Sequence, residues 1–175
     1  LDERDPSAHW TLGRAHWLMG HDQQALAGLR QSVALSPNFA LGHYSLAFVN
    51  AQTGDARSAI IDADRSRALS PFDPLLFAML SSRAIAMMRL DQFDEAANWL
   101  LRASAEPNAH SHIGALAAHC LALAGRVEEA RDQVDQVQRR RPGYAIDDLL
   151  TAFRLPVTLV TRMRQVAKRI GMDRD

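Results

Sequence analysis

Residues 6–39 read PSAHWTLGRAHWLMGHDQQALAGLRQSVALSPNF, and residues 40–73 read ALGHYSLAFVNAQTGDARSAIIDADRSRALSPFD. The two stretches match at a constant offset of 34 residues. Five pairs carry the match: Leu12 and Leu46, Gly20 and Gly54, Ala25 and Ala59, Leu35 and Leu69, and Pro37 and Pro71. A fixed period of this size indicates stacked supersecondary units, each of which buries its apolar face only against its neighbours.

The small residues of this pattern predict that each unit is a pair of helices. The glycine of each unit can adopt the left-handed conformation that closes a first helix. The alanine that follows lets a second helix approach the first closely. The proline at the end stops the second helix, because proline cannot continue it.

The order of these residues resembles the tetratricopeptide repeat (TPR), a helix–turn–helix unit of about 34 residues. The first unit offers Trp10, Leu12, Gly13, Trp17, Gly20, Ala25, Leu29 and Pro37 in the order of the family pattern. The second offers Tyr44, Leu46, Ala47, Gly54, Ala59, Ala63 and Pro71, and the aromatic rings lie one place from their usual family positions. The resemblance implies an all-α fold, a right-handed superhelical solenoid of helix–turn–helix repeats.

Two further units follow with one interruption of the period. Ala96 follows Ala59 by 37 residues rather than 34, so we expect three extra residues to lengthen a helix over 74–89, capped by Asp73. Ala130 follows Ala96 by 34 residues and restores the period. The predicted helices of the four units are 6–19, 22–35, 40–53, 56–69, 74–89, 93–105, 110–124 and 127–140.

The predicted boundaries divide the chain into a repeat region and a cap. Residues 1–143 hold the repeats, and residues 144–175 hold C-terminal capping helices, one short within 144–153 and one starting at Pro156. An apolar stripe on the last helix predicts that it covers the final repeat. Within the first region we expect the tail of a preceding repeat at 1–5 and repeats at about 6–39, 40–73, 74–109 and 110–143. Because the chain begins in such a tail, we expect it to be a fragment of a longer protein.

The composition excludes several classes of function. Lysine and arginine total 20 and so do aspartate and glutamate, so the zero net charge predicts no general attraction to nucleic acid or to an anionic membrane. Cys120 is the single cysteine, which suits a reducing, cytoplasmic compartment. No apolar run approaches the ~20 residues of a membrane span. The sequence also shows no phosphate-binding glycine loop and no catalytic motif, so we expect neither catalysis nor a cofactor.

The turns of the second half carry a second resemblance. They are residues 69–77 (LSPFDPLLF), residues 107–110 (PNAH), and an ending that contains Pro142-Gly143-Tyr144, Phe153-Arg154 and Ile170-Gly171. Together they are similar to the C-terminal repeat region of bacterial signalling proteins. Those proteins join TPR repeats to a class III adenylate cyclase domain or to a winged-helix DNA-binding domain. The resemblance implies a regulatory role in signalling or transcription, in which this region senses a partner.

Stacked repeats form a concave surface from their first helices, and such proteins bind partners there. Aromatic and arginine side chains dominate binding hot spots, so we expect an apolar or amphipathic protein segment, a helix laid in the groove, as the partner. The predicted groove residues are Trp10, Arg14, Trp17, Tyr44, Phe48, Gln52, Ser82, Ile85, Arg89, His112 and His119. Some TPR domains clamp a carboxylate with lysine and asparagine. Here Arg14 and Phe48 stand where the asparagines are expected, which argues against that role.

Alternative interpretations stay open. The rings of Trp17 and Phe48 are explained equally well as packing between repeats. Another domain or segment of the same protein is a second candidate occupant of the groove. A domain that senses a small ligand and a homo-oligomerisation module are the alternative functions.

The seven histidines do not predict a metal site. His9 with His16, and His112 with His119, are seven residues apart, whereas two ligands on one helix need a spacing of four. His119 and Cys120 are adjacent, so their side chains point in different directions on a helix and form no nucleophile–base pair. We therefore expect no metal and no catalytic cysteine.

Overall fold

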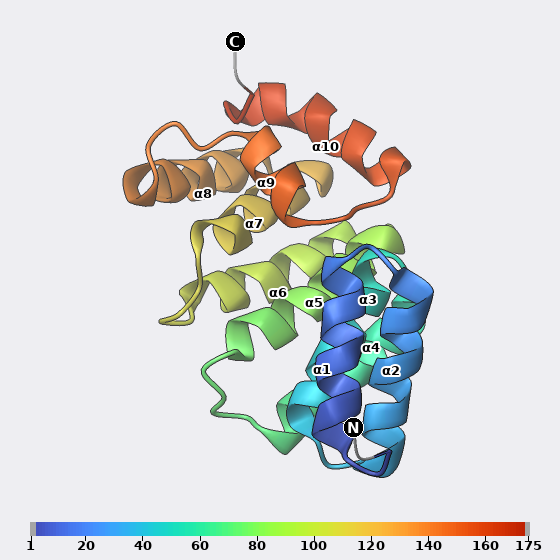
Figure 1. Ribbon diagram of the computed structural model, residues 1–175. Coiled ribbons are helices and arrows are strands. Elements are labelled where there is room, and N and C mark those ends of the chain that lie inside the picture. The colour runs from blue at the N-terminus through green and yellow to red at the C-terminus, as the bar shows by residue number, and fades with distance from the viewer. Residues whose placement is uncertain (1–2, 174–175) are drawn as a thin grey trace.

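The computed structural model describes residues 3–173, over which the chain forms ten helices and no strand (Figure 1). The helices are α1 (Pro6–Leu18), α2 (Asp22–Leu35), α3 (Ala40–Gln52), α4 (Ala56–Leu69), α5 (Leu76–Arg89), α6 (Phe93–Ala105), α7 (Ser111–Leu123), α8 (Val127–Arg140), α9 (Ile146–Ala152) and α10 (Val157–Ile170). The all-α prediction is confirmed. Leu1 and Asp2, part of the predicted repeat tail, lie outside the described residues.

The first eight helices pack in sequence order. Each odd-numbered helix packs on the helix that follows it, and each even-numbered helix packs on the start of the next pair. The first helices of successive pairs also contact one another, α1 with α3, α3 with α5, and α5 with α7. As a result the chain builds a solenoid in which α1 and α10 lie at opposite ends (Figure 1).

The four alanines that mark the second helices are fully buried in the structure. Ala25, Ala59, Ala96 and Ala130 are each 0% exposed. Small side chains at such positions let paired helices approach each other closely. Gly13 shows the same constraint from the opposite helix, because a Cβ built there would lie 2.8 Å from Leu29 Cγ and 3.0 Å from the carbonyl oxygen of Ala25.

The turns between paired helices follow the predicted chemistry only in part. Gly20 has φ +80° and Gly125 has φ +85°, as expected for glycines that close a helix. Gly54 does not adopt a positive φ. This position needs glycine because it has no space for a side chain: a Cβ there would lie 2.2 Å from the side-chain oxygen of Asn50. In the third pair the left-handed position belongs to Asp91, with φ 60°.

The predicted lengthening of the helix over 74–89 by three residues is wrong. Helix α5 begins at Leu76 and has 14 residues, one more than the corresponding first helices α1, α3 and α7. The extra residues lie mainly in the connection before it. There Asp73 accepts hydrogen bonds from the Leu75 amide at 2.8 Å and the Ser70 hydroxyl at 2.9 Å, so Asp73 closes a turn and does not cap the helix.

Helices α9 and α10 cover the last pair (Figure 1). The amide of Ile146 donates to the carbonyl of Met172 at 2.8 Å, which ties the start of α9 to the end of α10. The predicted apolar stripe of α10 faces the protein. Its members Leu159, Met163, Val166, Ala167 and Ile170 are buried, and Val160 is half-buried.

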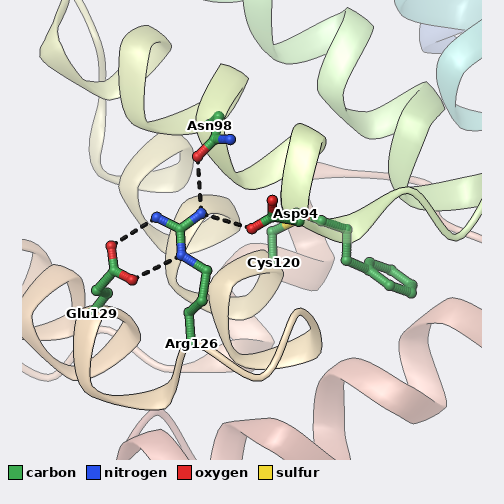
Figure 2. A network of polar contacts seen from close by, with 6 residues as sticks. Asp94, Asn98, Cys120, Arg126 and Glu129 are labelled. Atoms are coloured by element: carbon green, nitrogen blue, oxygen red, sulfur yellow. Dashed lines mark hydrogen bonds and ion pairs between the residues drawn. The ribbon is translucent and has the colours of Figure 1, made fainter.

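A polar network joins the third and fourth pairs (Figure 2). The Arg126 guanidinium donates to both carboxylate oxygens of Glu129, at 2.8 and 2.7 Å. It also donates to Asp94 and Asn98 on α6, at 2.9 Å each. Beneath this network the Cys120 thiol donates to the Phe93 carbonyl at 3.2 Å. Arg126 therefore holds the start of α8 against α6.

Replacing a crossing alanine tests whether close helix approach holds the pairs together. We expect Ala25→Leu to lower the free energy of unfolding by about 1–3 kcal/mol, because the added methylenes have no space. Ala27→Leu is the matched control on the same helix, since Ala27 is exposed. Urea unfolding measures both, and equal losses in the two variants would contradict the packing argument.

Candidate functional site

The connection between α9 and α10 returns to the N-terminal half of the molecule (Figure 1). Residues 153–156, here called the return segment, lie across the first helices and contact α3 and α1. The backbone amide of Arg154 donates to Gln52 Oε1 at 2.7 Å, a contact between residues 102 positions apart. We call the face of α1, α3, α5 and α7 on which this segment lies the inner face.

The Arg154 side chain anchors the return segment to the first pair. Its guanidinium carbon lies 4.1 Å from the centroid of the Trp17 ring. It also pairs with Asp22 at 3.1 Å. Trp17 is thereby covered, with 6% of its surface exposed. One arginine thus reaches both helices of the first pair.

The preceding residue anchors the same segment to the fourth pair. The buried Phe153 ring meets His112 edge to face at a centroid distance of 6.4 Å. His112 Nδ1 lies 2.6 Å from the Tyr144 hydroxyl, and their rings are 5.6 Å apart. The chain between Tyr144 and Pro156 therefore spans the inner face from α7 to α1.

A second group of predicted residues remains beside the return segment. Phe48 contacts Trp17 edge to face at 5.7 Å and Tyr44 at 6.1 Å. The Arg14 guanidinium carbon lies 5.5 Å from the centroid of the Phe48 ring. Arg14, Tyr44 and Phe48 are all half-buried. We call these three residues the aromatic pocket.

The Arg14 side chain contains a hydrogen-bond donor that has no acceptor within residues 3–173. Its Nη1 atom is buried and has no hydrogen-bond partner within residues 3–173. A buried donor without a partner carries the full cost of its lost hydration. Arg14 therefore carries an uncompensated desolvation cost in this structure.

The remaining predicted groove residues serve the fold in this structure. The Trp10 indole donates to Ser45 Oγ at 2.8 Å between the first two pairs. Arg89 donates to the carbonyls of Asn50, Ala51 and Gly54 at 2.8–3.1 Å and so closes the end of α3. Ser82, Ile85 and His119 are enclosed, with exposures of 0%, 1% and 0%. Their role as partner contacts stays a prediction.

Sequence reasoning missed the return segment as part of the inner face. It has no helical period and lies between two predicted helices, so the sequence indicates only a connection there. The available signal was composition, since Phe153, Arg154 and Leu155 place an aromatic, a cation and an aliphatic residue directly before a proline.

Two pockets open where the return segment meets the first helices. One, of about 350 Å³, lies between the ends of α3 and α5 and is lined by Gln52, Thr53, Arg89, Arg154, Leu155 and Pro156. The other, of about 290 Å³, lies between α5 and α10. Both border the segment, so a change in its position alters both.

Known structures resemble this architecture over nearly its whole length. A structure of MamA superimposes with a TM-score of 0.69 at 15% identity, covering 89% of this chain and 80% of that one. YrrB, described as a TPR protein with an unusual peptide-binding site, gives 0.66 at 16% identity, with 97% and 88% covered. TTC0263, a thermophilic TPR protein from Thermus thermophilus, gives 0.66 at 18% identity, with 94% and 82% covered.

The chain has the tetratricopeptide-repeat fold. No family model matches the sequence, and no curated protein matches it. At these identities the likeness concerns the fold of the TPR solenoid alone.

Metal ligands and the single thiol can be assessed among residues 3–173. Within that range no cluster of three or more His, Cys, Asp or Glu side chains is arranged to hold a metal ion. Burial raises the pKa of the Cys120 thiol, so this side chain stays protonated. None of the ten described helices has the length and apolarity needed to cross a membrane.

The inner face holds several titratable groups whose pKa burial shifts. Burial lowers the pKa of His112 and of His110, and the charge of His110 lowers that of His112 further. Burial raises the pKa of Tyr44, and the charge of Arg14 opposes this. Near neutral pH these histidines and this tyrosine are therefore uncharged, and arginine carries the positive charge of the inner face.

His119 is the most strongly shifted histidine. Its Nδ1 donates to the Ala115 carbonyl at 2.8 Å, and its buried Nε2 has no partner within the described chain. Burial lowers its pKa to about 4. The unfolded chain therefore takes up a proton near pH 6.5, whereas the folded chain takes it up only near pH 4. The contribution of His119 to the free energy of unfolding is fully present above about pH 6.5 and is lost progressively as the pH falls toward 4.

This shift predicts a measurable acid sensitivity. Between about pH 7 and pH 5 the His119 contribution should lower the free energy of unfolding by about 2 kcal/mol, because only the unfolded chain gains the proton. We expect His119→Leu to lose less stability than wild type over the same interval. Urea unfolding at both pH values provides the comparison, and an equal loss would show that His119 does not titrate as argued.

Proposed function

We propose that this TPR solenoid is a non-catalytic interaction module that binds an apolar or amphipathic segment of a partner protein on its inner face. The supporting observation is that the inner face already holds the return segment of its own chain. That segment makes a main-chain hydrogen bond to Gln52 and places Arg154 over Trp17. These are the contacts with which a groove holds an extended peptide.

The aromatic pocket supplies the remaining recognition. Tyr44 and Phe48 offer half-buried rings for an apolar side chain, which is the usual character of a binding hot spot. Arg14 requires an oxygen acceptor within the same pocket. The partner segment that fits best has an apolar residue for the rings and a carboxylate or carbonyl oxygen for Arg14.

The return segment competes with such a partner. Arg154 is held by one stacked ring and by one ion pair whose side chains are 41% and 34% exposed, so its attachment is weak. A partner segment that takes the place of Arg154 over Trp17 gains that ring as a further contact. We propose that binding shifts the return segment and exposes the full length of the inner face.

The module is further proposed to be the regulatory C-terminal part of a larger cytoplasmic bacterial protein that acts in signalling or transcription. This part of the proposal rests on the sequence resemblance of the turns at 69–77 and 107–110 and of the C-terminal region. The sequence of the full gene product tests it, because a cyclase or winged-helix domain before residue 1 is the expected finding.

Peptides selected from a displayed library of short random segments test the inner face. We expect Arg14→Gln and Phe48→Ala to weaken the best synthetic peptide at least about tenfold, because each removes one contact of the aromatic pocket. Arg154→Ala should strengthen binding, since it loosens the competing segment. Calorimetry measures the affinities, and circular dichroism checks that each variant keeps its helices.

The control for this experiment is Ile61→Ala on α4. Ile61 is apolar and 69% exposed, but it lies on a second helix, away from the inner face. Its affinity should equal that of wild type. A library that yields no binder, or binders that Arg14→Gln, Phe48→Ala and Ile61→Ala affect alike, would overturn the proposed site.

Self-association is the second candidate function, and one observation favours it. Leu12, Leu18 and Met19 lie along α1 and at its end with 42%, 75% and 58% of their surfaces exposed. Apolar side chains gathered on an end helix are typical of a surface that another helix covers.

Light scattering at increasing concentration distinguishes this candidate from a monomeric module. If α1 is the contact, the apparent mass of wild type should rise toward that of a dimer, and Leu18→Ser should remain monomeric. A wild-type mass that stays constant over the concentration range would exclude self-association through α1.

A further inference from the structure

Three arginines from three consecutive helices surround one tryptophan. Trp99 lies on α6, and the guanidinium carbons of Arg67, Arg83 and Arg102 lie 5.4, 4.7 and 4.6 Å from the centroid of its ring. They come from α4, α5 and α6 respectively. An indole has two faces, so at least two of these three guanidinium groups lie over the same face.

One carboxylate serves this group of cations. Asp64 pairs with Arg83 at 2.5 Å and with Arg67 at 3.4 Å. Arg102 forms no ion pair within residues 3–173. We call Trp99, the three arginines and Asp64 the Trp99 cluster. Three positive charges and one negative charge leave it with an excess of two positive charges.

Three other arginines both stack on a ring and form an ion pair, and each of them has one carboxylate that balances its charge. Arg154 stacks over Trp17 and pairs with Asp22. In the same way, Arg162 over Phe93 pairs with Asp91, and Arg141 over Tyr144 pairs with Asp148. In the Trp99 cluster, by contrast, a single carboxylate stands against three arginines, so two positive charges are not balanced.

The cluster also contains a donor with no acceptor. Arg83 Nε is buried and makes no hydrogen bond within the described part of the chain. Three guanidinium groups repel one another, and the ring quadrupole and a single carboxylate offset only part of that repulsion. An anion at this place would relieve the repulsion and accept hydrogen bonds from the arginines.

We propose that the Trp99 cluster is a binding site for a phosphate group carried by a phosphorylated side chain of a protein segment. A phosphate monoester carries a charge of about −1.5 to −2 at pH 7, which matches the excess of the cluster. Its oxygens accept paired hydrogen bonds from the planar guanidinium group. Arg102 is exposed, whereas the Arg83 side chain is only 19% exposed.

This site is separate from the inner face and does not rest on the function proposed there. Its cations come from α4, α5 and α6, and none of them belongs to the aromatic pocket. Each site can therefore fail its test without affecting the other.

The indole N–H resonances in a ¹H–¹⁵N spectrum test the proposal directly. The chain has three tryptophans, and Trp99→Phe assigns the signal of Trp99. Titration uses sodium phosphate, a phosphoserine peptide, the same peptide without phosphate, and sodium chloride at matched ionic strength. We expect phosphate and the phosphopeptide to shift the Trp99 signal in a saturable way. Trp17 is the internal control, because its single stacked arginine is already paired.

Two variants complete the experiment. Arg102→Gln should weaken the phosphopeptide at least about tenfold, because it removes the arginine that has no carboxylate partner among residues 3–173. Arg131→Gln is the matched control, since Arg131 is exposed and pairs with Glu128 on α8. A phosphopeptide that binds at least about tenfold more tightly than inorganic phosphate supports recognition of a modified protein segment.

Three results would overturn the proposal. One is a Trp99 signal that moves equally with sodium chloride, which shows screening and not binding. Another is an Arg102→Gln variant that binds as tightly as Arg131→Gln. The third is equal affinity for inorganic phosphate and the phosphopeptide, which assigns the cluster to free phosphate instead.

Discussion

The close approach of paired helices at four buried alanines is the constraint on which the structure depends. With a methyl group at each crossing, the two backbones lie near enough for the flanking leucines and aromatic rings to pack. The same approach repeats at each pair, so the first helices align on one side and the second helices on the other. The inner face and the Trp99 cluster are both consequences, because each collects side chains from neighbouring pairs.

The parts of the fold that depend on this constraint could be predicted from the sequence. Ala25 and Ala59 mark the period, and the helix bounds follow it closely in the first two pairs. The connection at residues 70–75 could not be predicted in the same way. Lengthening a loop costs little free energy, so extra residues are tolerated in a connection. Since a connection has no helical period, the sequence does not show where the extra residues lie. Counting residues alone assigned it to the neighbouring helix.

The types of residue on the inner face could be predicted from the sequence, whereas the exposure of each side chain could not. Counting from the repeat placed Arg14, Tyr44 and Phe48 together, and the structure brings them into contact. It also predicted Gln52 as a groove residue, but its partner Arg154 is 102 positions away. Such a contact depends on how the cap folds back across the solenoid, and no local pattern encodes it. For the same reason, Trp17 is a predicted groove contact in the sequence and is covered in the structure.

Charge compensation differs among the arginines that stack on aromatic rings. Arg154, Arg162 and Arg141 each stack on a ring and pair with one carboxylate, which balances their charge. Arg14 and the Trp99 cluster lack that balance, and each includes a buried N–H without an acceptor among residues 3–173. A buried donor lowers stability unless something satisfies it. Because both proposed surfaces combine such a donor with an arginine stacked on a ring, the proposals for the inner face and for the Trp99 cluster rest on the same physical argument.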